Sequence, residues 1–247
     1  MNSARCRSYR RRILDISQKV TAHVAPAFSC LEMVDVIYHD LMRPQDMFVM
    51  SKGHGALAQY VVLESLGKLS LDEYCAGSLG AHPDRGGPIE ASTGSLGHGL
   101  GLAVGMAYAE YLKGTDAQVF VVMSDGELQE GSTWEAVQMA ANLKLDNLVL
   151  FVDLNDFGGL DRISTGHPAV YPVAEKFEAF GWDANQGDGH DADDLRNMYW
   201  TRPGDRPFVI VGETVKGRGV SYMESKNIWH YRSPNKDEYA KAMEELA

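Results

Sequence analysis

Hydrophobic and polar positions along the 247-residue chain follow helical spacing in some stretches and form short apolar runs in others. Apolar residues recur every three or four positions, which predicts helices over 5–22, 31–42, 54–66, 97–113, 133–143, 172–180, 191–200 and 236–246. Three short runs in the second half are almost wholly apolar, which predicts buried strands over 119–123, 148–152 and 208–211.

Alternating strands and helices, with strands apolar on both sides, are typical of an α/β domain. We therefore expect a central, mostly parallel sheet with helices on both faces. No repeat, low-complexity segment or long linker divides the sequence, so we expect a single domain over 1–247. Ligands of such sheets bind at the carboxyl ends of the strands, which directs attention to the segments after Met123, Val152 and Val211.

Two of these segments carry oxygen ligands. Asp125 and Gly126 follow the first strand, and Asn155 follows the second strand, 30 residues after Asp125. One right-handed crossover would place the two segments side by side, where a carboxylate and an amide oxygen suit Mg²⁺. Gly126 and the following helix N-terminus would favour a diphosphate. Asp-Gly and Asn are also common in ordinary turns and caps, so spacing alone leaves both interpretations open.

A glycine-rich segment runs from Gly94 through Leu96 to Gly105 and precedes the first predicted strand. Because each glycine inside a helix costs about 1 kcal/mol relative to alanine, some contact must require them. Either another backbone packs closely here, for example at a subunit interface, or a ligand touches the main chain. The spacing is not that of a dinucleotide-binding fingerprint, and the pattern leaves both alternatives open.

Four histidines stand in polar or glycine-containing surroundings. His54 lies within Ser-Lys-Gly-His-Gly, His82 precedes Pro83, and His23 and His230 lie near the two ends of the chain. None has the spacing of a zinc site. Imidazoles suit phosphates and sugar hydroxyls, although a surface or core role is the alternative for each of them.

Charge and cysteine content narrow the class of protein. The 23 Lys+Arg against 34 Asp+Glu give a net charge of −11, which argues against a nucleic-acid binder. The basic run within 5–12 is expected to form the solvated face of the first helix, with a nucleic-acid arm as the alternative. Asp15 interrupts any signal-like apolar run, and no uncharged stretch reaches the roughly 20 residues that a bilayer requires. Cys6, Cys30 and Cys75 form no CxxC pair, which favours free thiols in a reducing cytoplasm. We therefore expect a cytoplasmic protein, and from the lack of a long apolar stretch we expect one that binds no membrane.

Taken together, these segments resemble the thiamine diphosphate-binding half of transketolase. The run Ser124-Asp125-Gly126, followed by Asn155, is similar to the family's fingerprint of Gly-Asp-Gly and a later Asn, with Ser124 in place of the first glycine. Further blocks of the family follow in the same order almost from end to end: 51–55, 92–97, 127–136, 145–148, 179–182, 188–191 and 215–220.

The resemblance implies a role for each matching residue. The side chains of Asp125 and Asn155 and the carbonyl of Phe157 would bind Mg²⁺, or Ca²⁺ or Mn²⁺ in its place. Thiamine diphosphate would contact His54, Gly94, Leu96, Gly126, Asn155 and His230. The catalytic residues would be His82 and His23, which bind donor hydroxyls, and Glu130, which faces the partner's half of the site.

The sequence ends at Ala247, whereas a complete transketolase continues into a pyrimidine domain and a further C-terminal domain. The resemblance therefore implies the first subunit of a split transketolase that moves a two-carbon ketol unit from a ketose (phosphate) to an aldose. A C-terminal subunit carrying the pyrimidine domain would complete it in an α₂β₂ assembly. The alternatives are a subunit of another thiamine diphosphate enzyme, such as a keto-acid decarboxylase or a deoxyxylulose-type synthase, or a non-catalytic scaffold.

Overall fold

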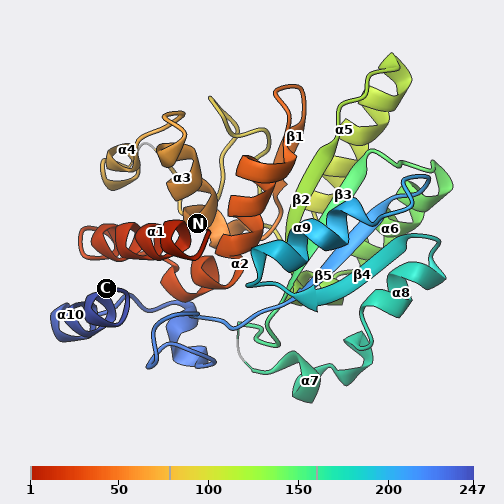
Figure 1. The fold of residues 1–247 in the computed structure, drawn as a ribbon. Helices are drawn as coiled ribbons and strands as arrows, with labels where there is room; N and C mark the ends of the chain where they lie inside the picture. The colour runs from red at the N-terminus through yellow and green to blue at the C-terminus, as the bar shows by residue number, and fades with distance from the viewer. Residues whose placement is uncertain (1, 78, 160) are drawn as a thin grey trace.

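The computed structural model describes residues 2–77, 79–159 and 161–247, whose five strands form one sheet (Figure 1). The strands are β1 (Met47–Met50), β2 (Val119–Ser124), β3 (Leu148–Leu154), β4 (Asp183–Asp188) and β5 (Phe208–Glu213). Their order is β1-β2-β3-β5-β4, and every neighbouring pair is parallel. The predicted α/β class with a mostly parallel sheet is confirmed.

The helices connect these strands and cover both faces of the sheet (Figure 1). They are α1 (Asn2–Ser17), α2 (Val24–Val36), α3 (Ala56–Ser65), α4 (Leu71–Cys75), α5 (Gly99–Lys113), α6 (Gly131–Asn142), α7 (Ile163–Gly166), α8 (Ala174–Ala179), α9 (Ala192–Trp200) and α10 (Lys236–Glu245). A π-helical turn over Ile37–Leu41 extends α2. Short 3₁₀ turns occupy Gly53–Gly55, Asp125–Gln129, Pro168–Val170 and Asn227–His230.

Alternate residues of the strands enter two separate cores. Phe120 and Phe151 belong to the core formed with α1, α2, α3 and α9, whereas Val121 and Val152 belong to the core formed with α5, α6 and α8. Successive strand residues point to opposite faces, so a strand buried on both sides must be apolar throughout. This explains the uninterrupted apolar runs of the sequence.

Two strands are absent from the prediction, for different reasons. β1 has only four residues and lies between helices. β4 has the sequence Asp-Ala-Asn-Gln-Gly-Asp at the edge of the sheet, where its side chains are half-buried or exposed. Neither the length of β1 nor the polarity of β4 produces an apolar run that a pattern search detects.

Helix α2 begins at Val24, seven residues before the predicted start at residue 31. All of its residues are buried, so it has no polar face and no helical periodicity over its first half. Helix α1 ends at Ser17 instead of residue 22, and α5 begins at Gly99 instead of residue 97. The short helices α4 and α7 were not predicted either.

The basic run lies on helix α1, as expected, and Arg7 is exposed, but the run is not solvated throughout. Arg5 pairs with Asp35 at 2.6 Å, and Arg12 pairs with Glu64 at 2.8 Å. Arg10 is itself buried and forms an ion pair of 2.7 Å with Glu32. These arginines attach α1 to α2 and α3 through acidic groups of the same chain.

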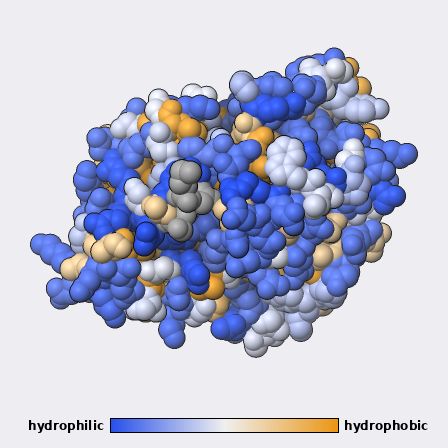
Figure 2. Space-filling view, in the orientation of Figure 1, coloured by the Kyte–Doolittle hydropathy of each residue, from blue (hydrophilic) through white to orange (hydrophobic). Residues whose placement is uncertain are grey.

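The molecular surface is largely polar but includes exposed apolar side chains (Figure 2). The face shown in Figure 2 is mostly hydrophilic, with small apolar areas. Large apolar side chains on α5 and α6 are exposed: Leu102, Tyr111, Leu112 and Met139. None of the helices described above is long and apolar enough to span a bilayer.

Candidate functional site

The carboxyl ends of β2 and β3 lie next to each other, because the two strands pair in parallel register through their last residues. Asp125 begins the turn after β2, and its Oδ2 accepts the backbone N–H groups of Asn155 (2.9 Å) and Asp156 (2.6 Å). The Asn155 side chain belongs to the same turn, since its Oδ1 accepts the N–H of Phe157 at 3.0 Å. Segments 30 residues apart in the sequence therefore meet at one edge of the sheet.

Asp125 carries a buried carboxyl group that forms no ion pair with any cationic side chain among the described residues. It is 1% exposed, and burial together with the charge of Asp153 raises its pKa to about 7. Asp153 pairs with Lys52 and Asp156 pairs with Arg162, whereas Asp125 forms no ion pair within the described ranges. A bound cation would supply the missing charge.

The oxygen atoms in this turn fit a hard divalent cation. The carboxylate of Asp125, the side-chain oxygen of Asn155 and the carbonyl of Phe157 are donors of the kind that Mg²⁺ prefers. The Phe157 carbonyl already accepts a hydrogen bond of 3.4 Å from the Lys216 ammonium group. In the part of the chain that the structure covers, no group of three His, Cys, Asp or Glu side chains offers an alternative metal site.

A cavity of about 250 Å³ opens beside this edge of the sheet. Most of the residues singled out in the sequence line it, although they come from segments far apart in the chain. They are His23, His54, His82, Gly94, Leu96, Asp125, Gly126, Phe157 and His230. Asn155 is not among these lining residues, although its N–H bonds to Asp125. The cavity also includes Tyr231, which the sequence did not indicate.

The four histidines form one wall of the cavity. The ring centroids of His54 and His230 are 5.1 Å apart, and those of His23 and His82 are 6.0 Å apart. Burial, followed by nearby positive charge, lowers the pKa of His54 well below its usual value and that of His230 to about 3. Burial also lowers the pKa of His82. These three rings are neutral at pH 7 and offer both hydrogen-bond donors and acceptors.

The glycine-rich segment packs within the chain. A Cβ atom at Gly53 would lie 2.6 Å from the Cα of Gly94. The loop carrying His54 and the loop carrying Leu96 can therefore pack this closely only because position 53 is a glycine. Gly94 has φ of +130° and lies against the ring of His82. Close backbone packing therefore explains Gly94, which also lines the cavity, whereas Gly101 and Gly105 have nothing within 4 Å of a Cβ atom.

Glu127 connects three of the loops, a function that the sequence pattern did not indicate. Its carboxylate accepts hydrogen bonds from the hydroxyl of Ser51, from the N–H of Gly97 at 3.3 Å and from the N–H of Ser124 at 2.9 Å. The side chain is fully buried, and burial raises its pKa. Glu127 thus fixes the positions of loops that line the cavity.

Two buried lysines are also missing from the residues singled out in the sequence. Lys52 pairs with Asp153 beneath the site. Lys216 is 2% exposed, and its Nζ lies 2.6 Å from Nδ1 of His230. Burial and the charge of Lys52 lower the pKa of Lys216 to about 8. Both lysines lie in blocks that resemble the family, and that resemblance was their only signal in the sequence.

Glu130 is the predicted catalytic residue that does not line this cavity. Glu130 forms the N-cap of α6 and lies beside Gly97. A Cβ atom added at Gly97 would lie 2.6 Å from the Cβ of Glu130. It lines a separate, more apolar hollow of about 810 Å³ that also includes Trp134 and Phe180.

A parallel α/β domain with hard oxygen donors, glycines and imidazoles around a cavity at the carboxyl edge belongs to the class that binds phosphorylated cofactors. A family model described as "Transketolase, thiamine diphosphate binding domain" matches residues 14–247, so the chain belongs to that transketolase family.

Relatives show which part of a transketolase the chain represents. It is 36% identical to an apulose-4-phosphate transketolase subunit of Phocaeicola vulgatus, over 96% of this chain and 91% of that protein. It is 36% identical to human transketolase, over 90% of this chain and 38% of that protein. Among solved structures, transketolase from Leishmania mexicana superposes with a TM-score of 0.91 at 26% identity, covering all of this chain and 41% of the other. The chain thus spans about two fifths of a full-length transketolase.

Proposed function

We propose that the chain is the thiamine diphosphate- and Mg²⁺-binding subunit of a two-subunit transketolase. The enzyme would transfer a two-carbon ketol unit from a ketose or ketose phosphate to an aldose. The observation that carries this proposal is the meeting of Asp125 and Asn155 at the carboxyl edge, beside a cavity lined by four histidines. Membership of the transketolase family supports the same reaction.

Asp125, Asn155 and Phe157 are the residues that would hold Mg²⁺, with Ca²⁺ or Mn²⁺ as substitutes. The metal would compensate the buried carboxylate and part of the charge of a diphosphate. Gly126, at the cavity wall, leaves room for the diphosphate beside the main chain. When bound, thiamine diphosphate supplies the carbon nucleophile that the reaction needs.

The remaining wall would hold the two ends of the cofactor. His54 and His230 lie together on the side of Lys216, where neutral imidazoles and an ammonium group would bind the diphosphate. Gly94 and Leu96, in the loop packed against Gly53, would lie against the aminopyrimidine ring. The exposed side chain of Leu96 would be covered by a partner.

His82 and His23 would bind the substrate. Their rings lie 6.0 Å apart on the cavity wall, and the Nδ1 of His23 is already bonded to the His230 carbonyl at 2.9 Å. The neutral ring of His82 can donate to an oxygen on which negative charge develops and can exchange a proton with it. Glu130, outside the cavity, would contribute through the partner's half of the site.

A second subunit with a pyrimidine domain would complete the site, in a heterotetramer with two copies of each chain. Two relatives that match over nearly their whole length are named as subunits of a transketolase, which supports a partner. The exposed apolar side chains of α5 and α6, together with Leu96 at the cavity, would form the docking surface. Ketose phosphates are the donor class suggested by the names of those relatives, and a reducing cytoplasm suits three free cysteines.

The metal assignment is tested by calorimetry on the chain purified together with its partner. Asp125→Ala should abolish Mg²⁺-dependent binding of thiamine diphosphate, whereas Asp205→Ala, at an exposed loop position, should bind as the unmodified protein does. Unchanged affinity in Asp125→Ala would refute the metal site. A screen of ketose, ketose phosphate and keto-acid donors on the same complex then separates ketol transfer from decarboxylation.

The docking surface is tested by two substitutions on opposite faces of the sheet. Leu102→Glu on α5 should prevent association with the second subunit. Trp200→Glu on α9 introduces the same charge at an exposed aromatic residue and should leave association intact. Steady turnover by the highly purified chain alone would contradict the need for a partner.

A further inference from the structure

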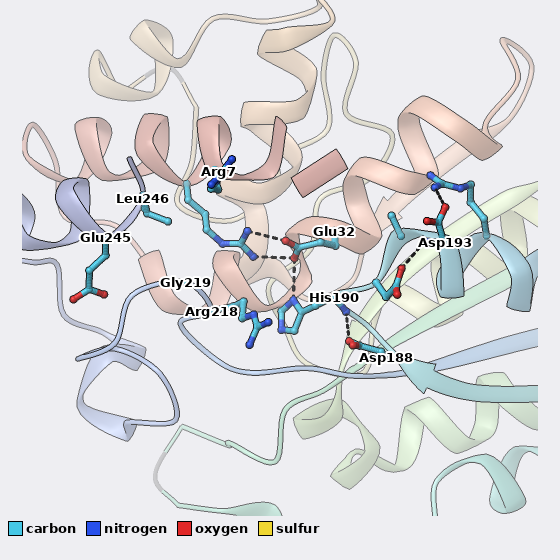
Figure 3. A pocket seen from close by; sticks show the side chains of 13 residues that line it. Arg7, Glu32, Asp188, His190, Asp193, Arg218, Gly219, Glu245 and Leu246 are labelled. Carbon is cyan, nitrogen blue, oxygen red and sulfur yellow. Dashed lines mark hydrogen bonds and ion pairs between the residues drawn. The ribbon is translucent and has the colours of Figure 1, made fainter. Parts of the chain in front are cut away.

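His190 lies outside the cofactor cavity but is hydrogen-bonded at both ring nitrogens. It belongs to the turn between β4 and α9, and its side chain is 8% exposed. Nδ1 lies 3.0 Å from Oε2 of Glu32 (Figure 3). Nε2 accepts the backbone N–H of Val215 at 2.8 Å. Because a backbone N–H only donates, Nε2 must be the unprotonated nitrogen, and Nδ1 must carry the proton toward Glu32.

Glu32 is held in place for this bond from the other side. Arg10 contributes one nitrogen at 2.7 Å to Oε1 and another at 2.9 Å to Oε2, and both residues are buried. Burial opposes ionisation of Glu32, but the His190 hydrogen bond and the Arg10 charge outweigh it and keep the pKa of Glu32 below its usual value. Arg10, Glu32 and His190 therefore form one connected set of fixed side chains, hereafter the Arg10–Glu32–His190 chain.

Through His190, the Arg10–Glu32–His190 chain is connected to the segment that carries Lys216. After β5, the N–H of Thr214 bonds to the carbonyl of Leu154 at 3.0 Å, and the N–H of Gly217 bonds to the carbonyl of Ala25 at 3.1 Å. Between them, the N–H of Val215 bonds to His190. From this fixed backbone, Lys216 extends its side chain to His230 and to the carbonyl of Phe157 at the cofactor cavity.

We propose that His190 is a positioning residue: held by Glu32 and Arg10, it fixes the backbone of Val215 and thereby places the Lys216 ammonium group at the diphosphate end of the cavity. The inference rests on the proposed function, since it assigns the Lys216 group to cofactor binding. A purely structural anchor would stabilise the fold equally well but would not act through one side chain at the cavity.

The test is a double-mutant cycle on the assembled complex, with thiamine diphosphate affinity measured in the presence of Mg²⁺. His190→Phe keeps the bulk but removes the acceptor and should weaken the affinity by about tenfold or more, as loss of a supporting partner does at other cofactor and metal sites. His190→Gln can accept from Val215 and donate to Glu32, so it should stay within about threefold of the unmodified complex. In a Lys216→Met background, His190→Phe should cause no further loss.

Equal losses from His190→Phe in both backgrounds, or no loss in either, would overturn the inference. Failure of the unmodified complex to bind the cofactor would instead refute the proposed function, and this inference with it. A second measurement needs no destabilising variant: ¹⁵N NMR of the full chain with labelled histidines, assigned with His190→Gln. A proton on Nδ1 and none on Nε2 is the expected result, and a proton on Nε2 would refute the proposed arrangement.

Discussion

Replacing Lys52 by methionine tests the charge pair beneath the site. Lys52 is 1% exposed, and its ammonium group donates to the Pro26 carbonyl at 2.8 Å, to the Ser29 hydroxyl at 2.8 Å and to the carboxylate of Asp153. Methionine has a similar length but no charge. The variant therefore leaves Asp153 fully buried, with hydrogen bonds from the hydroxyls of Ser29 and Thr214 alone.

The expected loss at pH 7 is about 3–5 kcal/mol, the usual cost of removing one partner from a buried ion pair. Without Lys52, Asp153 can take up a proton instead of remaining an unpaired buried carboxylate. The free energy of that protonation is an upper limit on the electrostatic part of the stability loss. Protonating an ordinary Asp carboxyl at pH 7, roughly three pH units above its reference pKa, costs about 4 kcal/mol. The unfolding free energy of such a domain is about 5–15 kcal/mol, so the variant should lose a large share of its stability.

The loss should depend on pH. In the unmodified chain, burial opposes ionisation of Asp153, but Lys52 outweighs it and keeps the pKa low. Without Lys52, the pKa of Asp153 in the folded state should rise above its value in the unfolded state. At pH values between these two pKa values, the folded variant therefore binds a proton that the unfolded chain does not. Its stability should therefore increase relative to the unmodified chain as pH falls from 7 to 5, by about 1.4 kcal/mol per pH unit.

Urea unfolding of the chain at pH 5 and pH 7 measures both effects. Lys68→Met, at an exposed position, serves as the matched control and should change stability by about 0.5 kcal/mol or less. Adding Asp153→Asn to Lys52→Met should restore part of the loss at pH 7, because it removes the uncompensated charge. A loss under about 1 kcal/mol at pH 7, or one that does not change with pH, would refute the reasoning.

Two further predictions concern the isolated chain. Gly97 has φ of +77°, and a Cβ atom there would lie 2.6 Å from both the Glu130 side chain and the Ser132 hydroxyl, so Gly97→Ala should destabilise by about 1–3 kcal/mol. Gly101→Ala, in an open position of α5, should instead stabilise by about 0.5–1 kcal/mol, and equal urea midpoints for the two variants would contradict this. Thiol titration at pH 8 should label Cys75 first, because Cys6 and Cys30 are buried and burial raises the pKa of Cys30 to about 12. Equal reaction rates for all three cysteines in the folded chain would be the contrary result.

The sequence by itself determined the α/β class, because β2, β3 and β5 are buried on both faces and must be apolar throughout. It also determined the pair of loops at Asp125 and Asn155, since one strand–helix–strand crossover between parallel neighbours brings such loops together. The edge strand β4 was not detectable, because a polar strand at the border of a sheet resembles a loop in its pattern.

Only the tertiary structure decided which polar groups are buried together. Glu127 joins three loops from distant parts of the chain. His190, bonded to Glu32, accepts the N–H of Val215 next to Lys216. Hydrophobic periodicity reports which face of an element is buried, but a charged residue has the same pattern whether water or a buried partner surrounds it. The burial that makes these charges chemically distinctive is therefore a property of the folded chain.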